Sequence, residues 1–421
     1  MRPCTVTICR FFRALLQLIL TLALLASVTV LAQEHPWAEI MHYWVSSGEQ
    51  AALRVLQHQF EADGGQWVTT PLPNQNKMRG AMISRVAEGL PPTLMQWHAG
   101  NNIVELAELD LVADIESIAQ RQNWHHIMPK VVLDSVTHKG RFIVVPVNIH
   151  GENWAWYNRS IYRHLKLAYP RNWDEFLVQA PRIKAAGYLP LAIGASGWQL
   201  RILFTDILIG IGGRKAYLQL ITSNRTTLNP TILLQTMQIL GALRQYSPPD
   251  GAELRWDEAT RLVINGQAAV QFMGDWAKSE FLAAGKIVGQ DFDCHLAPGN
   301  EMVYVTVIDA FAFAKTIDPR QQAAQRLIAK HILSPKIQRA FSLAKGSVPV
   351  NKNVDMAGFD RCAQIGIKSI RDDNAAVPAP SLVAAFVQSG VLDVHLTNFW
   401  HDLALTPEQA VQQLMTDLQE K

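Results

Sequence analysis

Short apolar segments alternate with amphipathic segments past the N-terminus, and this alternation limits the fold more than any other feature of the sequence. Residues 38–48 read as a strand that ends in small residues, and residues 49–65 read as a helix closed by two glycines. Residues 66–73, 77–92 and 93–102 continue the order with a strand, a helix and a strand. This order predicts an α/β protein with mostly parallel sheets.

The length of the chain predicts more than one hydrophobic core. It has 421 residues, 49% of them hydrophobic, and single cores stop growing near about 250–300 residues. We therefore expect two domains. The net charge of +2 lacks the basic excess of a protein that binds nucleic acid, so no nucleic-acid partner is expected.

The first 32 residues read as a secretory signal peptide. Three arginines precede a long apolar run, and Val30 and Ala32 are small residues placed as expected before a cleavage site. A retained membrane anchor is the alternative, because the run is long enough to span a bilayer. Cleavage is favoured by the small residues, and it would change the net charge from +2 to −1. The predicted location is the periplasm.

Only two cysteines remain beyond this leader, Cys294 and Cys362. An even number in an oxidising compartment is consistent with one disulfide. Two separate buried thiols are the alternative, because bridging depends on a Cα spacing that the sequence does not give. His295 beside Cys294 lacks a matching ligand set, so no metal site is expected.

Polar and aromatic residues gather where the predicted strands end. Ligands of open α/β sheets bind beyond the carboxyl ends of strands, where loops enter helices. The first three such ends carry Tyr43, Trp44 and Glu49, then Lys77, then Gln96, Trp97, His98 and Asn102. A fourth group, Asp275, Trp276 and Lys278, follows the apolar run that ends at Met273.

Two strand-like runs in the middle of the chain, 142–147 and 154–157, are linked by a polar turn with His150 and Asn153. Trp154 and Trp156 in the second run follow the strand period, and we expect them to pack on opposite faces. Further along, Asp309 comes directly after an apolar strand. A carboxylate there is costly unless it has a partner or a cleft, which favours a functional role.

Six stretches, taken in their order and spacing, resemble the extracellular solute-binding proteins of ABC sugar transporters, in the glucose/mannose-binding branch. They are YWVSSGE, GRFIVVPVNIHGENWAWYN, YPRNWDEF, INGQAAVQFMGDWAK, APGNEMVYVTVIDAFAF and LSPKIQRAFSLAKGSVPVNK. The resemblance covers nearly the whole chain past the leader.

The resemblance implies the two-lobed α/β fold of periplasmic binding proteins (type II), with discontinuous lobes joined by hinge crossings. The implied first lobe holds residues 33–143 and 307–349, and the second holds residues 144–306 and 350–421. The implied crossings lie near residues 142–150, 304–309 and 347–353.

A sugar site follows from the resemblance and from the chemistry of the residues. A pyranose has C–H groups on its faces and hydroxyls around its edge, so it needs an aromatic plate and planar polar groups. The candidate substrate-binding residues are Tyr43, Trp44, Glu49, Lys77, Gln96, His98, Trp276, Lys278, Asp309, Lys345 and His395. Lys345 has a second interpretation, as a basic residue at the end of a helix before Gly346.

Two positions depart from the pattern of the family. Tyr43 stands where a second tryptophan is expected, and Asn102 stands about where a carboxylate is expected. The first change gives a smaller plate with its own hydroxyl. The second removes an acceptor charge and puts a strict preference for monosaccharides in doubt.

The implied function is the periplasmic substrate-binding component of an ABC sugar import system. Such a protein binds a neutral monosaccharide as a monomer and delivers it to a membrane permease, without chemistry or a cofactor. One alternative is a sugar-sensing protein that docks on a membrane receptor. Another is a secreted glycoside hydrolase, in which Glu49 with Asp309 or Asp275 would supply the two carboxylates. Motifs of other hydrolases are absent from the sequence.

Overall fold

The computed structural model describes residues 35–222, 228–249, 251, 254–372, 374–383 and 386–419. The predicted leader, residues 1–32, lies outside this part of the chain. Within the described residues no helix combines the length and the apolar character needed to cross a bilayer.

The elements follow one another along the chain in three groups. The first group is β1 (Trp37–His42), α2 (Ser47–Ala62), β2 (Gln66–Pro71), α3 (Gln75–Ala87), β3 (Leu94–His98), α4 (Asn101–Glu108), α5 (Glu116–Arg121), α6 (Trp124–Ile127), α7 (Lys130–Val136), β4 (Thr137–His138) and β5 (Arg141–Phe142). The second group is β6 (Val145–Gly151), β7 (Trp154–Asn158), α8 (Arg159–His164), α9 (Trp173–Ala185), β8 (Leu189–Leu191), α10 (Gly197–Ile221), α11 (Pro230–Leu243), η2 (Arg244–Tyr246), α12 (Trp256–Ile264), β9 (Ala268–Phe272), α13 (Ala277–Ala283) and β10 (Phe292–Leu296). The third group is β11 (Tyr304–Phe313), α14 (Pro319–Ile332), α15 (Pro335–Lys345), β12 (Val348–Pro349), α16 (Arg361–Ile370), β13 (Ala376–Pro378), α17 (Pro380–Val383), α18 (Phe386–His401) and α19 (Pro407–Gln419).

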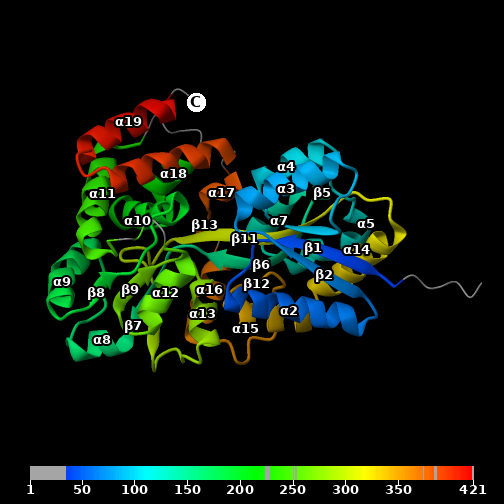
Figure 1. Ribbon diagram of the computed structural model, residues 1–421, viewed down its shortest axis with the longest axis horizontal. Coiled ribbons are helices and arrows are strands. Elements are labelled where there is room, and N and C mark those ends of the chain that lie inside the picture. Colours follow the sequence, from blue (N-terminus) through cyan, green and yellow to red (C-terminus); the bar gives the residue numbers. More distant parts are fainter. Residues whose placement is uncertain are drawn as a thin grey trace, which may run out of the picture.

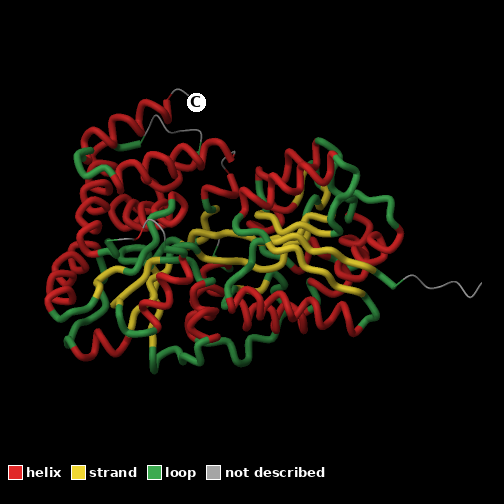
Figure 2. Tube along the Cα trace, in the orientation of Figure 1, coloured by secondary structure: helices red, strands yellow, loops and turns green. Residues whose placement is uncertain are grey.

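Two sheets define two lobes that lie side by side (Figure 1). The first has the strand order β12-β6-β11-β3-β1-β2, with β13 paired to β11, and the second has the order β10-β7-β9-β8. Strands lie inside each lobe and helices lie outside (Figure 2). The pairs β1–β2, β1–β3, β8–β9 and β11–β13 are parallel, as the sequence predicts. The pairs β3–β11, β6–β11, β6–β12, β7–β9 and β7–β10 are antiparallel, so both sheets are mixed, which corrects the expectation of mostly parallel sheets.

The strand β11 runs from one lobe into the other. Val305 and Val307 near its start pack in the core of the second lobe, whereas Ile308 and Phe311 pack in the core of the first. β6 lies antiparallel beside it and β12 lies beside β6. The three segments predicted as hinge crossings therefore include three neighbouring strands.

The segment after β12 contacts both lobes. Val350, Val354 and Phe359 belong to the hydrophobic core of the first lobe, although they follow the predicted boundary at residue 349. Cys362, at the start of α16, is bonded to Cys294 on β10 of the second lobe, with Cα atoms 6.0 Å apart.

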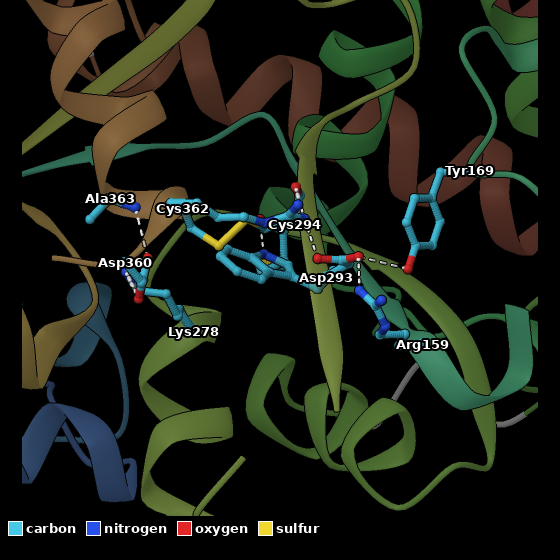
Figure 3. The surroundings of a disulfide bond; sticks show 11 residues. Arg159, Tyr169, Lys278, Asp293, Cys294, Asp360, Cys362 and Ala363 are labelled. Atoms are coloured by element: carbon cyan, nitrogen blue, oxygen red, sulfur yellow. Dashed lines mark hydrogen bonds and ion pairs between the residues drawn. A yellow bond between two sulfur atoms is a disulfide. The ribbon is translucent and has the colours of Figure 1, made fainter. Parts of the chain in front are cut away.

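Polar contacts surround this disulfide (Figure 3). The carboxylate of Asp293, next to Cys294 on β10, accepts hydrogen bonds from Arg159 at 3.1 Å and from the Tyr169 hydroxyl at 3.0 Å. It also pairs with Arg361, the first residue of α16. The start of α16 is thus attached to the second lobe by one covalent bond and by a fully paired carboxylate.

Trp154 and Trp156 share one face of β7, which corrects the expectation of opposite faces. Their rings stack at 5.7 Å with an interplanar angle of 24°. The physical reason is the strand period of two, which puts residues i and i+2 on the same side.

Candidate functional site

A buried polar network crosses the lobe boundary. The Tyr43 hydroxyl lies 2.9 Å from His98 Nε2, which lies 3.5 Å from Asp309 Oδ1. The other oxygen of Asp309, Oδ2, lies 3.2 Å from His150 Nε2. His150 Nδ1 pairs with Asp275, which comes from the second lobe. These five residues, which we call the polar network, link the two lobes through one imidazole.

Strand register explains this assembly. On β11, Asp309 stands opposite His98 of β3 and opposite Asn148 of β6, and the ladder shifts register after Asp309. Asn148 and His150 are two residues apart on β6, so both point to the same face. Three members of the network, His98, Asp309 and His150, therefore come from neighbouring strands of the first sheet.

Charges in the network reinforce one another. Burial would raise the pKa of Asp309, but the hydrogen bond and charge of His150, with the charges of His98 and Lys345, lower it to about 2. Burial acts in the opposite sense on His150, yet the charge of Asp275 and the bonds to both carboxylates raise its pKa. Burial lowers the pKa of His98, and the charge of Asp309 offsets part of that fall. Asp309 and His150 form an ion pair beside a histidine that is harder to protonate than usual.

Glu49 and Lys345 lie near this network on the first lobe. Glu49 Oε2 accepts from the backbone N–H groups of Val45 and Ser46, and Ser46 caps α2 in return. Glu49 Oε1 lies 3.7 Å from Lys345 Nζ. Burial raises the pKa of Glu49, and the charge of Lys345 offsets part of that rise. Lys345 ends α15 before Gly346, whose φ is 78°, so it has the helix-end position as well as the ion pair.

Trp44 lies in the core of the first lobe, although the sequence favours a position against a ligand. It is 1% exposed and packs against Phe311 and Phe341. Lys345 Nζ lies 5.6 Å from its ring centre. The indole therefore supports the Lys345 ammonium instead of presenting a free face.

Trp276 is the half-buried indole at the lobe boundary. Its ring centre lies 5.3 Å from that of His150, with the two ring planes nearly perpendicular, and 6.3 Å from that of Trp198. A Cβ at Gly274 would collide with this ring, which explains the glycine two residues earlier. Asp275 is fixed to β6 through the backbone of Gly151. The turn after β9 thus places an indole and a carboxylate together.

Of the remaining predicted substrate-binding residues, one lies beside the polar network and one lies in an ion pair elsewhere. Gln96 Oε1 accepts from the Tyr43 N–H at 3.0 Å, so Gln96 lies beside the network. Lys278 is buried and paired with Asp360 at the start of α16.

Lys77 and His395 are not brought to the network. Lys77 is exposed in the first turn of α3. His395 lies on α18, where its Nε2 is 2.8 Å from Asp417. The side chain of Asn102 lies outside the described part of the structure.

Several polar side chains near the boundary were not predicted as site residues. They are Asn148 and His150 on β6, Glu152 after it, and Trp198 and Arg201 at the start of α10. The polar turn between two apolar strands was a signal for His150 and Glu152. No local spacing marked Arg201.

The two lobes touch where α2 meets α13. The Gly48 N–H donates to Glu280 Oε1 at 2.9 Å, and a Cβ at Gly48 would overlap the side chain of Ser279. This close approach of a first-lobe helix to a second-lobe helix holds the lobes together in this structure.

Other features of the surface are less suited to a site. A hollow of about 670 Å³ on the first lobe is lined by charged side chains of both signs, among them Glu108, Arg121 and Lys315. It contains none of the network residues, so we place the candidate site at the network, where buried polar atoms have no hydrogen-bond partner within the described part of the chain. Among the residues described, no cluster of three or more His, Cys, Asp or Glu side chains is arranged to hold a metal.

Comparison with known proteins identifies the family to which this chain belongs. The family model described as bacterial extracellular solute-binding protein matches residues 46–336. A probable sugar-binding periplasmic protein of Brucella melitensis is 32% identical over 406 residues, covering 93% of this chain and 95% of the relative. A protein of the same description from Mesorhizobium japonicum is 31% identical, covering 90% and 92%.

Solved structures share the fold at low sequence identity. A chitin oligosaccharide binding protein has a TM-score of 0.77 at 20% identity, covering 92% of this chain and 99% of the other. The bacterial solute receptor AcbH, described with an exclusive preference for β-D-galactopyranose, has a TM-score of 0.78 at 16% identity, covering 91% and 98%. Maltose-bound MalE3 of T. maritima has a TM-score of 0.71 at 18% identity, covering 91% and 99%.

Proposed function

This chain belongs to the family of bacterial extracellular solute-binding proteins and has their two-lobed α/β fold, and on that premise we propose that it binds a neutral hexose of the glucose or mannose type between its lobes. The protein is exported to the periplasm by its cleaved leader. It acts as a monomer and delivers the sugar intact to an ABC permease.

The observation that carries this proposal is a set of buried polar atoms around Asp309 that have no hydrogen-bond partner among the residues the structure describes. They include Gln96 Nε2, His98 Nδ1 and both amide atoms of Asn148. A buried polar atom without a hydrogen bond costs about 1–3 kcal/mol. Sugar hydroxyls both donate and accept, so one pyranose can supply partners to all of these atoms.

An aromatic plate completes the site. Trp276 is half-buried, lies against His150 and brings an indole face to the boundary of the lobes. The C–H groups on a pyranose face pack on such a ring, while its hydroxyls reach Asp309 and His98. The charged partners make these hydrogen bonds stronger than neutral ones.

Closure of the lobes couples binding to transport. A sugar in contact with Asp309 on the first lobe and Trp276 on the second binds the closed form more tightly than the open form. Only this difference in affinity can shift the population toward closure. The contact of Gly48 with Glu280 belongs to the closed form. A permease that docks on the rims of both lobes then distinguishes loaded from empty protein.

Titration calorimetry with glucose, mannose, galactose and xylose tests the proposal. We expect saturable binding of at least one hexose, weakened by about tenfold or more in Asp309→Asn and in Trp276→Ala, because a hydrogen bond to a charged group contributes about 1.5–3 kcal/mol. Asp174→Asn, an exposed carboxylate on α9, is the control and should leave the affinity unchanged.

Two results would overturn the proposal. One is the absence of binding by any sugar of the panel to folded protein. The other is the release of the aglycone from an aryl glycoside, which would indicate a hydrolase with paired carboxylates.

A further inference from the structure

His150 is the central residue of the polar network, because each of its ring nitrogens faces a carboxylate. Nδ1 pairs with Asp275 Oδ1, and Nε2 lies 3.2 Å from Asp309 Oδ2. The side chains of all three residues are at most 5% exposed. Water does not readily replace a lost partner at such a depth, so each carboxylate depends on the donors that the protein supplies.

Asp275 is held from several sides. Its Oδ2 accepts from the Gly151 backbone N–H at 3.1 Å and from the Tyr304 hydroxyl at 3.4 Å. Its own backbone N–H donates to the Gly151 carbonyl at 2.9 Å. These bonds do not involve His150, and they fix Asp275 Oδ1 beside His150 Nδ1. A carboxylate fixed in this way keeps a proton on the ring nitrogen that it faces.

Asp309 is held less completely. Among the described residues its carboxylate is faced by two imidazoles, that of His150 at Oδ2 and that of His98 at Oδ1, the latter at 3.5 Å. His98 Nε2 also lies 2.9 Å from the Tyr43 hydroxyl, so this nitrogen is shared between two partners. The direction in which Asp309 presents its oxygens therefore depends mainly on His150.

The charge of His150 decides whether the ring can hold both carboxylates. A protonated imidazole has two N–H donors, whereas a neutral one has a single donor and a lone pair. If Asp275 keeps the proton on Nδ1, a neutral ring turns its lone pair toward Asp309 Oδ2, and the two repel. Burial alone would lower the pKa of His150, but the charge of Asp275 and the bonds to both carboxylates raise it, which agrees with a ring that donates twice.

We propose that His150 is a positioning residue whose protonated form aims the Asp309 carboxylate at the sugar, so that the affinity for the hexose depends on pH. This rests on the proposed function, in which Asp309 accepts hydrogen bonds from sugar hydroxyls. His150 acts through Asp309 and need not touch the ligand. Because coupling between two binding events is reciprocal, a bound sugar also favours protonation of His150. The protein then takes up part of a proton when it binds sugar.

Other titratable groups face His150 or its carboxylates from each neighbouring element. They are Asp309 and Tyr304 on β11, Asp275 after β9, Glu152 after β6, His98 on β3 and Lys345 on α15. Burial lowers the pKa of His98, and burial raises the pKa of Tyr304 well above its usual 10, so the two titrate on either side of His150. A loss of affinity above pH 6.5 that disappears when His150 is replaced therefore reports His150 itself.

Calorimetry of the natural protein across a pH series tests the proposal. The probe is the tightest-binding of glucose, mannose and galactose, titrated from about pH 5.5 to about pH 9.5. We expect about tenfold weaker binding at the alkaline end, which corresponds to a difference of about one unit in the His150 pKa between free and loaded protein. Titrations at the midpoint in buffers of different ionisation enthalpy should show uptake of about half a proton per sugar.

Two variants separate positioning from a merely structural role. His150→Gln cannot titrate, so its affinity should be about tenfold lower at the acidic end and should not fall further with pH. Asp275→Asn should move the midpoint of the fall to lower pH, because the charge of Asp275 favours the protonated ring. His331→Gln is the matched control and should leave the pH profile unchanged, since this histidine on α14 lies 3.1 Å from Asp63, outside the network.

The outcomes distinguish this proposal from the proposed function. Sugar binding with the same affinity at every pH, or without proton uptake, overturns the positioning role and leaves the proposed function intact. A His150→Gln variant whose affinity falls with pH in parallel with that of the natural protein also overturns it, because this is the result of a merely structural role. If His150→Gln fails to fold, the shifted midpoint of Asp275→Asn and the proton uptake of the natural protein decide. Absence of binding by every sugar at every pH overturns both proposals.

Discussion

Two regions hold the lobes of this protein together by different means. The polar network joins them through titratable groups, with His150 between Asp275 and Asp309. The staple, defined as Cys294, Cys362 and the paired carboxylate of Asp293, joins them through a covalent bond and satisfied polar contacts. Among the described residues, both oxygens of the Asp293 carboxylate have partners, whereas His98 of the network keeps a buried ring nitrogen without one. Incomplete pairing in a buried region therefore distinguishes the candidate site from the structural connection.

The staple also limits how the lobes can move. Cys362 at the start of α16 is bonded to the second lobe, while Ile367 and Ile370 further along the helix pack in the core of the first. Lys278 of α13 adds an ion pair to Asp360 at the same end. A hinge motion that opens the network must then bend β6 and β11 about a crossing that stays attached to the second lobe.

Removal of the disulfide should have the largest effect on stability. The cysteines are 68 residues apart, and closing a loop of that size contributes about 4 kcal/mol in the chain-entropy account. We expect Cys294→Ala/Cys362→Ala to lower the free energy of unfolding by about 2–4 kcal/mol. Urea denaturation of the oxidised protein, the reduced protein and the double variant measures this difference. Equal midpoints for all three would refute a stabilising role of the bond.

Acid should weaken the network by an amount near the lower end of that range. The folded pKa of Asp309 is about 2, against a usual 3.8, and this difference corresponds to about 2 kcal/mol. A carboxyl group whose pKa is lowered by folding stabilises the folded state at pH values above its unfolded pKa. That stability is lost as the pH falls from about 4 to about 2. Unfolding curves of the natural protein and of Asp309→Asn should therefore converge over that range. A constant difference between them would contradict the ion pair.

Alkali should act on the same network through His150. Its pKa is raised, so its contribution is complete below the ordinary value of 6.5 and is lost as the pH rises through the folded value. The charged groups facing His150 are Asp275, Asp309 and Lys345. We expect His150→Gln to remove this decline in stability above pH 6.5, as measured by thermal unfolding in a series of buffers. If the decline persists in the variant, another group is responsible.

A substitution at Gly48 tests the contact between α2 and α13, which is separate from the polar network and from the staple. A methyl group there would overlap Ser279 in this structure, and moving the lobes apart would relieve the overlap. Gly48→Ala should therefore weaken sugar binding by about tenfold, or about 1.4 kcal/mol, with little loss of stability. Gly80→Ala is the matched control, since Gly80 lies in a helix with open space around it. Calorimetry that finds both variants equal to the natural protein would place α2 and α13 apart when sugar is bound.

The order of strands and helices in the first lobe could be predicted because the two periodicities differ along residues 37–98. The directions of the strands near the lobe boundary could not be predicted. A strand buried on both faces has the same apolar pattern whether it pairs parallel or antiparallel, and β11 pairs antiparallel with β3 and β6. The disulfide stayed one of two interpretations until the Cα separation was known.

The site was predictable to the extent that it lies at strand ends. His98 and Asp309 were each predicted as site residues, and they meet because β3 and β11 pair with these two residues opposite each other. Trp44 also follows a strand, but a large aromatic ring suits a core as well as a ligand, and in this fold it fills the core. His150 and Arg201 were missed because their importance arises from packing between distant segments. No spacing along the chain records that proximity.

The smallest expected effect on stability comes from replacing one arginine of the staple, and it is compared here with the loss of the shared carboxylate. Asp293 is buried with three partners, whereas the side chains of Arg159 and Arg361 are 35% and 47% exposed. Replacing one arginine leaves two partners on the carboxylate, and a partly exposed ion pair contributes about 0–1 kcal/mol. Arg361→Gln should therefore lower the free energy of unfolding by less than about 1 kcal/mol. Asp293→Ala removes the shared acceptor and should cost about 1–3 kcal/mol. Urea denaturation of both variants gives the order, and a larger loss for Arg361→Gln would mean that the arginine, rather than the saturated carboxylate, secures the start of α16.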